Sequence, residues 1–138
     1  MTLSPVADLL AAVDRLDVGA TVAMCAPDCS FMAVDGRHAE GRDALEVLLE
    51  AFFSQLRSTS HEITSQWQFE DVWIAEALAT YELADWLRIE KLPRAFVIRT
   101  GPQGISELRA YGAHERPLSE HRTGGELVRI GGRPVLPL

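Results

Sequence analysis

Three side chains on or beside the apolar segments of this chain are candidates for proton transfer. Tyr81 lies within the alternating run from Val72 to Leu83, so its hydroxyl can donate a hydrogen bond to a carbonyl or phenolate oxygen if it faces a pocket. Histidine titrates near neutral pH, so His114 can act as a general base, and Asp35 can do the same from a turn. Each also has a structural explanation, as a core tyrosine, a solvent-exposed histidine at a strand end and a turn-forming aspartate.

A second set of residues shares strand faces with these candidates and would bind a ligand if those faces line a pocket. Strand side chains alternate, so Trp73 falls on the same face as Tyr81, and Arg94 and Phe96 share one face of the next apolar run. Arg94 can pair with a ligand carboxylate or with Asp85, or it can extend to the rim of the protein. The rest of this face is mostly apolar, which predicts a small, largely apolar ligand oriented by a few polar groups.

No residue pattern indicates a metal or a cofactor. Cys25 and Cys29 have the wrong spacing for the redox motif with two intervening residues, and no second Cys/His pair completes a zinc site. His38 and His61 have no partner pattern for metal ligation. We therefore expect buried, apolar cysteines, no metal and no cofactor.

Composition narrows the class of protein. The chain has 138 residues, of which 47% are hydrophobic, and this predicts one domain with its own core. The formal charge of −7 is spread along the chain, and the absence of a basic stripe argues against a nucleic-acid partner. No apolar stretch approaches the ~20 residues that span a bilayer, and residues 1–5 lack the features of a signal peptide. We expect a cytoplasmic protein that does not bind membranes.

Helical periodicity dominates the first third of the chain. Ser4-Pro5 is a typical helix start, and apolar residues follow at helical spacing to Leu16. Asp17 is expected to cap a second helix that runs through Cys25. A third helix is expected to open at residue 41, with an apolar stripe that continues to Leu56.

Alternating patterns predict the strands. A short strand is expected at 29–34, and four longer ones at 60–69, 72–83, 92–99 and 105–111, the last four forming an antiparallel meander. One face of the 60–69 strand is expected to carry His61, Ile63, Ser65, Trp67 and Phe69. This order of elements predicts an α+β fold in which three N-terminal helices cover one face of a strongly curved sheet.

Five short sequence segments carry a family resemblance. They are Leu16-Asp17-Val18-Gly19, Pro27-Asp28-Cys29-Ser30-Phe31, Glu40-Gly41-Arg42-Asp43-Ala44-Leu45, Leu92-Pro93 and Leu108-Arg109-Ala110-Tyr111. With the element order, they resemble the nuclear transport factor 2-like superfamily, with its SnoaL-like polyketide cyclase, ketosteroid isomerase and limonene epoxide hydrolase branches. The resemblance implies a cone: a strongly bent, mixed, mostly antiparallel sheet that wraps around three helices and leaves an apolar pocket. It also implies that the backs of two sheets meet in a homodimer.

We place this domain at residues 1–118 and interpret residues 119–138 as a C-terminal extension. The extension is expected to form a small hairpin that packs on the domain or on a partner subunit.

The catalytic residues of the known branches have no counterparts at matching positions. An alignment without gaps places the general-base aspartate, oxyanion tyrosine and oxyanion aspartic acid of the isomerase at Ala33, Ala12 and Phe96. The Asp-Arg-Asp triad of the epoxide hydrolase falls on Ala79, Ala77 and Ala110. None of these side chains can transfer a proton, so neither mechanism operates here in its known form.

Two classes of function therefore stay open. The first is a cofactor-independent isomerase, cyclase or lyase that acts on a small apolar carbonyl compound by proton transfer, with Tyr81 as donor and His114 or Asp35 as base. The second is a non-catalytic ligand-binding or dimerisation module that lacks the family's acids. A homodimer is expected from the apolar residues on the outward face of the long strands, which are Ile74, Leu78, Val97 and Tyr111. Trp67 and Trp86 are expected in an interface or the core.

Overall fold

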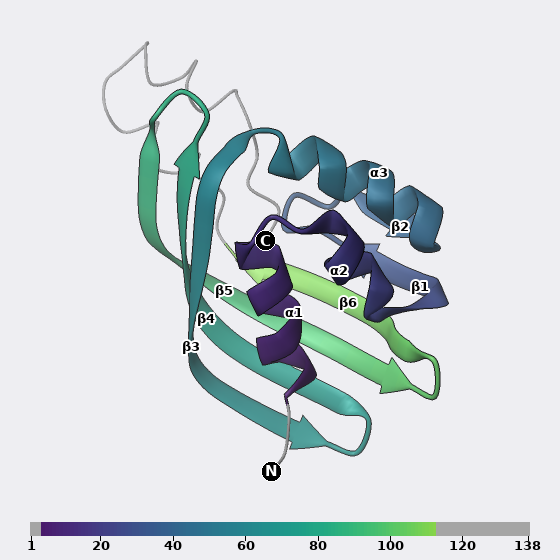
Figure 1. Ribbon diagram of the computed structural model, residues 1–138. Helices are drawn as coiled ribbons and strands as arrows, with labels where there is room; N and C mark the ends of the chain where they lie inside the picture. The colour runs from purple at the N-terminus through teal and green to yellow at the C-terminus, as the bar shows by residue number, and fades with distance from the viewer. Residues whose placement is uncertain (1–3, 113–138) are drawn as a thin grey trace.

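The computed structural model describes residues 4–112. They form three helices and one six-stranded sheet (Figure 1). The helices are α1 (Pro5–Asp14), α2 (Val18–Ala23) and α3 (Arg42–Phe53). The strands are β1 (Cys25–Met32), β2 (His38–Glu40), β3 (Leu56–Phe69), β4 (Val72–Leu83), β5 (Arg88–Gly101) and β6 (Gly104–Gly112). His114 and the hairpin expected within 119–138 lie outside the described residues.

The sheet is mixed, as expected. Its strand order is β2-β1-β6-β5-β4-β3, and β3 to β6 form the predicted antiparallel meander. Strand β1 pairs antiparallel with β2 and parallel with β6. The α+β cone predicted from the element order is therefore confirmed.

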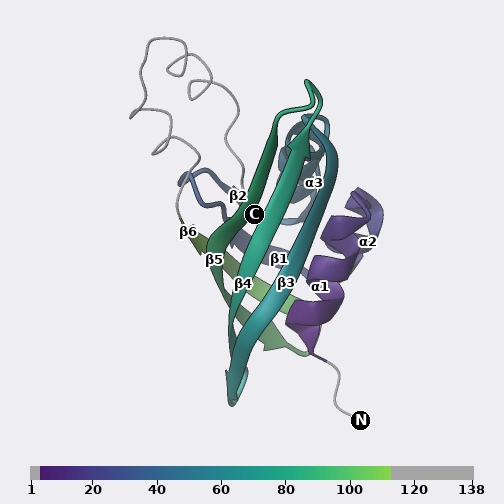
Figure 2. The same cartoon turned by 90° about the vertical axis from the view of Figure 1, so that its left-hand side faces the viewer.

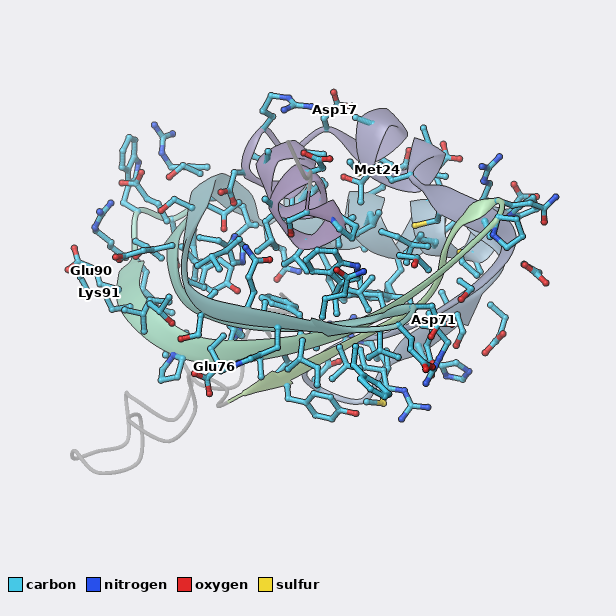
Figure 3. The ribbon with its side chains drawn as sticks, turned by 90° about the horizontal axis from the view of Figure 1, so that it is seen from below. Asp17, Met24, Asp71, Glu76, Glu90 and Lys91 are labelled. Atoms are coloured by element: carbon cyan, nitrogen blue, oxygen red, sulfur yellow. The ribbon has the colours of Figure 1, made fainter. Side chains whose placement is uncertain are left out.

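All three helices lie on the concave side of the sheet. Figures 1 and 2 show β3, β4 and β5 bending along their length so that they enclose the helices from one side. The view from below in Figure 3 shows the same curvature, with Glu76 on the convex side. The core lies between the helices and the sheet, while Ala79, Tyr81 and Leu83 begin a second apolar cluster farther along β4. No helix within residues 4–112 is long and apolar enough to cross a membrane.

Capping residues set the helix starts. The Ser4 hydroxyl oxygen accepts hydrogen bonds from the backbone N–H groups of Val6 and Ala7, and the Asp17 carboxylate accepts one from the N–H of Ala20. Both starts match the expectation. Helix α2 ends at Ala23, so the expected continuation through Cys25 is wrong.

Strand β1 begins earlier than expected because it contains an irregularity. Cys25 pairs with Ile105 and Ser30 with Glu107, so extra residues, among them Pro27, bulge out of β1 between these two pairs. The bulge breaks the alternating pattern and leaves both Cys25 and Cys29 buried. Only the regular part after Cys29 has the sequence signature of a strand.

Two other boundaries also differ from the expectation. Leu56, placed in the third helix, opens β3 and pairs with Leu83. Its apolar side chain continues the helical stripe, which explains the error. Strand β5 starts at Arg88 rather than Leu92, because four mainly charged or polar residues there resemble a turn yet pair with the end of β4.

A bulge in β3 reverses the facing of its last residues. The register shifts between Ile63 and Ser65, so Trp67 pairs with Ile74 on the convex side of the sheet. The side chains of Trp67 and Phe69 are exposed, Trp67 by 54%. Their expected place on the same face as His61 is therefore wrong, as is a core position for Trp67. Trp86 is likewise exposed, in the β4–β5 turn.

Candidate active site

Asp14 and His61 form an acid–histidine pair between helix α1 and strand β3, in which the imidazole is buried and the carboxylate is partly exposed. The carboxylate of Asp14, the last residue of α1, lies 2.7 Å from the Nδ1 atom of His61. Its second oxygen accepts a hydrogen bond of 3.0 Å from the backbone N–H of His61. The His61 side chain is 0% exposed, whereas that of Asp14 is 27% exposed. Two contacts to one carboxylate fix the orientation of the imidazole ring.

The other ring nitrogen of His61 has no hydrogen-bond partner among the described residues. Nε2 is buried and makes no hydrogen bond within the described part of the chain. A carboxylate can only accept, so beside an ionised Asp14 the proton of a neutral imidazole belongs on Nδ1. Nε2 then presents its lone pair, which is the arrangement that a general base requires. Buried polar atoms without a partner are rare in folded proteins, and here the atom belongs to a side chain able to carry a proton.

Tyr81 and Arg94 lie next to this pair. The ring of Tyr81 meets the ring of His61 edge to face, with the centroids 6.1 Å apart. The Nε–H of Arg94 donates to the Tyr81 hydroxyl oxygen over 3.4 Å. That oxygen accepts from Arg94, so its own proton remains available for donation to another group.

Burial determines the protonation of Tyr81. Its side chain is 1% exposed, and loss of solvent raises the pKa of the phenol above its usual value, against the opposing charge of Arg94. Tyr81 therefore keeps its proton at neutral pH. It is a hydrogen-bond donor in this site, and of the two buried rings only His61 can accept a proton.

The register of the sheet brings these groups together. His61 pairs with Ala79 of β4, and Arg94 of β5 pairs with Ala77. Both alanines are buried and face the interior, so no large side chain separates the polar groups. Phe96 follows on the same face of β5, and its ring centroid lies 5.9 Å from that of His61. We call Asp14, His61, Tyr81 and Arg94 the polar cluster.

The structure separates the other predicted site residues from the polar cluster. Trp73 is half-buried at the other end of β4, eight residues from Tyr81, which is roughly 27 Å along a strand. Of the three predicted ligand-binding residues, Arg94 and Phe96 therefore lie at one place and Trp73 does not.

Asp35 is already engaged in its own turn. Its carboxylate accepts hydrogen bonds from the backbone N–H and the Nε–H of Arg37, the latter at 2.6 Å. The Arg37 guanidinium in turn lies 4.5 Å from the centre of the Phe52 ring. These contacts support the turn-forming explanation of Asp35. They leave His61 as the base that the geometry favours.

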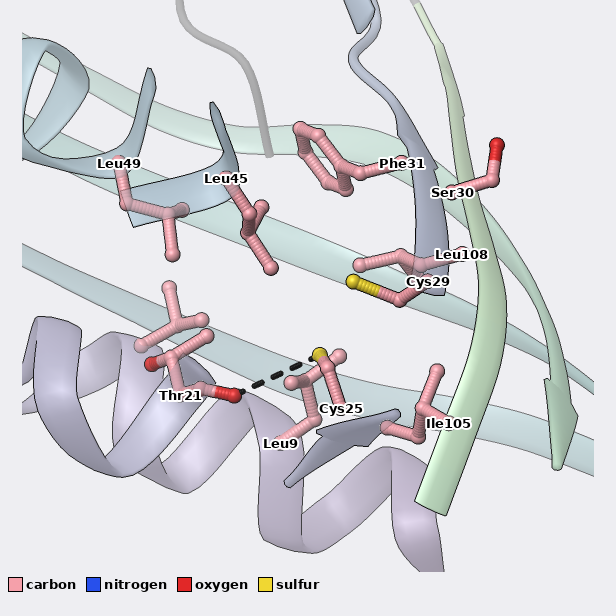
Figure 4. A pocket seen from close by; sticks show the side chains of 11 residues that line it. Leu9, Thr21, Cys25, Cys29, Ser30, Phe31, Leu45, Leu49, Ile105 and Leu108 are labelled. Atoms are coloured by element: carbon pink, nitrogen blue, oxygen red, sulfur yellow. Dashed lines mark hydrogen bonds between the residues drawn. The ribbon is translucent and has the colours of Figure 1, made fainter. Parts of the chain in front are cut away.

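The two cysteines belong to a different region, drawn in Figure 4. Leucines from α1 and α3, with Thr21, Phe31, Cys25 and Cys29, line an apolar cavity of about 10 Å³, room for about one water molecule. The Cys25 thiol donates to the backbone oxygen of Thr21 over 3.6 Å. This cavity does not include Tyr81 or His61, and it is too small for a substrate. Within residues 4–112 no cluster of three metal-ligating side chains occurs.

Burial of Cys25 makes stability depend on alkaline pH. Loss of solvent, followed by the neighbouring Cys29, raises the pKa of the Cys25 thiol from 9.0 to about 12. Above pH 9 the unfolded chain loses this proton while the folded chain keeps it, so the free energy of unfolding falls as pH rises towards 12. We expect a loss of up to about 1.4 kcal/mol per pH unit from this thiol. Urea unfolding of the parent and of Cys25→Ala at a series of pH values above 9 measures it; equal slopes would contradict the prediction.

Sequence reasoning missed Asp14 and His61 as a functional pair. They are 47 positions apart, and no short motif links them. The available signals were weak: Asp14 follows the buried Leu10 by one helical turn, and His61 lies within the polar stretch 57–62 of β3. Only the docking of α1 on β3 brings the two side chains into contact.

Comparisons with known proteins agree with this fold. The family model of the SnoaL-like domain matches residues 6–116. No curated protein matches the chain significantly. Among solved structures, a hypothetical protein of ketosteroid isomerase-like fold from Catenulispora acidiphila, in complex with trimethylamine, has a TM-score of 0.74 at 18% identity and covers 82% of this chain and 88% of its own.

Two further structures carry names of enzymes. A putative SnoaL-like polyketide cyclase from Shewanella denitrificans has a TM-score of 0.71 at 10% identity, with 79% of this chain and 88% of the other covered. An LEH-like epoxide hydrolase from M. tuberculosis has a TM-score of 0.68 at 16% identity, with 79% and 80% covered. At such identities, similarity shows the shared fold alone.

Proposed function

This chain belongs to the SnoaL-like domain family, and from that premise we propose that it is a cofactor-independent enzyme that transfers a proton on a small, apolar carbonyl compound. The observation that carries the proposal is the buried Nε2 atom of His61, which has no hydrogen-bond partner within residues 4–112 while Asp14 holds the opposite nitrogen. The reaction classes that fit are isomerisation, cyclisation and elimination, each of which begins with removal of a proton beside a carbonyl.

Each member of the polar cluster has a distinct role in this proposal. Nε2 of His61 removes the proton from the carbon beside the carbonyl. The Tyr81 hydroxyl donates to the carbonyl oxygen, where negative charge develops. Asp14 orients the ring and stabilises the imidazolium that forms, and the Nε–H of Arg94 holds the phenol oxygen in place. The proton then returns to the same carbon, to another carbon or to a leaving group.

Apolar walls support a small, apolar substrate. Phe96 packs beside His61, and Ala79 and Leu83 flank Tyr81 on β4. A pocket with apolar walls and a few orienting polar groups is the usual design of a small-molecule site. Solved neighbours include a protein in complex with the small amine trimethylamine and a putative polyketide cyclase. They support the proposal of a small organic ligand here.

Deuterium exchange tests the proposal without knowledge of the natural substrate. Methyl isobutyl ketone, a small apolar ketone, is incubated with the protein in D₂O, and loss of the NMR signals of the protons beside its carbonyl is followed. We expect faster exchange with the folded protein than with buffer or with the heat-unfolded chain. Binding of the ketone without faster exchange would instead favour a non-catalytic ligand-binding module, which the alanines at the family's catalytic positions also fit.

Removal of the Tyr81 hydroxyl should weaken ligand binding and leave the fold intact. Tyr81→Phe keeps the buried ring but deletes the donor, so the affinity for methyl isobutyl ketone should fall by about 0.5–1.5 kcal/mol. NMR titration measures the affinity, and Tyr111→Phe, on the exposed convex side, is the matched control. Equal affinity in Tyr81→Phe and the parent would remove Tyr81 from the site.

A homodimer through the convex side of the sheet is part of the proposal. Trp67, Ile74 and Tyr111 are each at least 41% exposed there, and Val97 lies next to Ile74. Exposed apolar residues that adjoin one another are typical of interfaces. We expect light scattering to give twice the mass of one chain, and Trp67→Asp to return it to the mass of the monomer. A monomeric parent at high concentration would contradict this.

A further inference from the structure

In the part of the chain that the structure describes, two polar atoms on one strand face are buried without a hydrogen-bond partner. Besides Nε2 of His61, the hydroxyl oxygen Oγ1 of Thr59 makes no hydrogen bond within the described residues, although Thr59 is only 6% exposed. Both residues belong to β3, and neither register shift of that strand falls between them. Unpartnered buried polar atoms are rare, and two on the same face of β3, beside Tyr81, point to one polar binding place.

The register fixes how these atoms are arranged. Residues two apart on a strand face the same side and lie roughly 7 Å apart, so one small molecule can contact both side chains. Thr59 pairs with Tyr81 across β3 and β4, and His61 pairs with Ala79. The residue opposite His61 is the small Ala79, so no bulky side chain from β4 stands directly across from the imidazole.

We infer that the Thr59 hydroxyl is a substrate-positioning group that binds a second oxygen of the substrate, and that the substrate class is a β-hydroxy ketone. This inference rests on the proposed function, since it uses Tyr81 for the carbonyl and His61 for the proton. In a β-hydroxy ketone the acidic carbon lies between the carbonyl carbon and the carbon that carries the hydroxyl group. That order matches a donor at Tyr81, a base at His61 and a hydroxyl partner at Thr59.

The reaction that follows is elimination of water. Nε2 of His61 takes a proton from this acidic carbon, and the electron pair of that C–H bond forms the enolate that Tyr81 stabilises. The enolate then collapses to a carbon–carbon double bond while the bond to the β-oxygen breaks. His61 returns its proton to the departing oxygen, which leaves as water. The products are one unsaturated ketone and one water molecule, with no oxidant or cofactor consumed.

A matched pair of ketones measures how much the hydroxyl group of the substrate contributes to binding. Diacetone alcohol is a β-hydroxy ketone, and methyl isobutyl ketone has the same carbon skeleton without the hydroxyl. We expect the parent protein to bind diacetone alcohol roughly 2- to 10-fold more tightly, the range expected for one added hydrogen bond. Thr59→Val, which keeps the shape of the side chain, should abolish the preference, and Thr59→Ser should retain it. NMR titration of the three proteins with both ketones measures the ratios.

The melting temperature of Thr59→Val distinguishes a substrate-positioning role of Thr59 from a structural role. An orphan buried hydroxyl contributes nothing to folding, so Thr59→Val should melt at the same temperature as the parent or higher. A fall of several degrees in Thr59→Val would show a structural partner for the hydroxyl and overturn the inference. So would a parent that binds both ketones equally, or a preference for diacetone alcohol that survives in Thr59→Val.

The two proposals fail in different ways. If the protein exchanges the protons of methyl isobutyl ketone but shows no preference for diacetone alcohol, proton transfer stands and the role of Thr59 falls. If the preference is present and lost in Thr59→Val, but neither exchange nor formation of mesityl oxide occurs, Thr59 binds the hydroxyl and the catalytic proposal falls. Formation of mesityl oxide from diacetone alcohol, slowed in both Thr59→Val and His61→Gln, supports both.

Discussion

Replacement of His61 by glutamine is expected to slow deuterium exchange of methyl isobutyl ketone by about 10²- to 10⁴-fold, the usual contribution of a general base. The glutamine amide can still donate to Asp14, so the contact between α1 and β3 is kept, but it offers no basic nitrogen at the position of Nε2. Exchange rates from NMR, measured at saturating ketone, compare the two proteins.

A matched histidine provides the control for this effect. His38 lies on β2 with a side chain 59% exposed, beside Glu40. His38→Gln also removes one imidazole from the chain, but it should leave the exchange rate unchanged. If both variants exchange the ketone at the rate of the parent, another group is the base, and His61 is a structural residue that ties β3 to α1.

Asp14→Ala is expected to cost about 2–4 kcal/mol of the free energy of unfolding, because it leaves two donors on His61 unsatisfied at a buried site. Asp14→Asn should cost less, since the amide oxygen can still accept from one of them. Urea unfolding of both variants measures the difference. The exchange rate should fall in both variants, because the ring loses the carboxylate that orients it.

A second aspartate of α1 serves as the control. Asp8 lies in the first turn of the same helix and is exposed, and its loss should cost only about 0.3–1 kcal/mol through the helix dipole. Equal destabilisation by Asp8→Ala and Asp14→Ala would mean that Asp14 acts only on the helix and not through His61.

Most of the fold could be predicted from the sequence, because alternation and capping are local. Val72 to Leu83 alternates without interruption and forms β4 with the predicted bounds, and Ser4 and Asp17 mark the helix starts. The errors in the facing of side chains fall where the backbone departs from regular pairing. The bulges after Cys25 and Ile63 each change the facing of the residues that follow, and no local pattern announces them.

The candidate site was only partly predictable, for a related reason. Tyr81, Arg94 and Phe96 were found because they sit on regular strands whose inward faces can be read by alternation. Asp14 and Thr59 were missed because their significance depends on the tertiary structure. Asp14 contacts the imidazole ring of a distant strand, and the buried Thr59 hydroxyl has no hydrogen-bond partner among the described residues. Neither property can be derived from spacing along the chain.

Intermolecular nuclear Overhauser effects between a bound ketone and the protein test the central claim most directly. With methyl isobutyl ketone and assigned side-chain resonances, we predict contacts from the ketone methyl groups to the rings of His61, Tyr81 and Phe96. These contacts should weaken in Tyr81→Phe, because this variant binds the ketone less tightly. Contacts confined to exposed residues of the convex side, such as Trp67 and Tyr111, would show that the polar cluster is not the binding site and would contradict the proposed function.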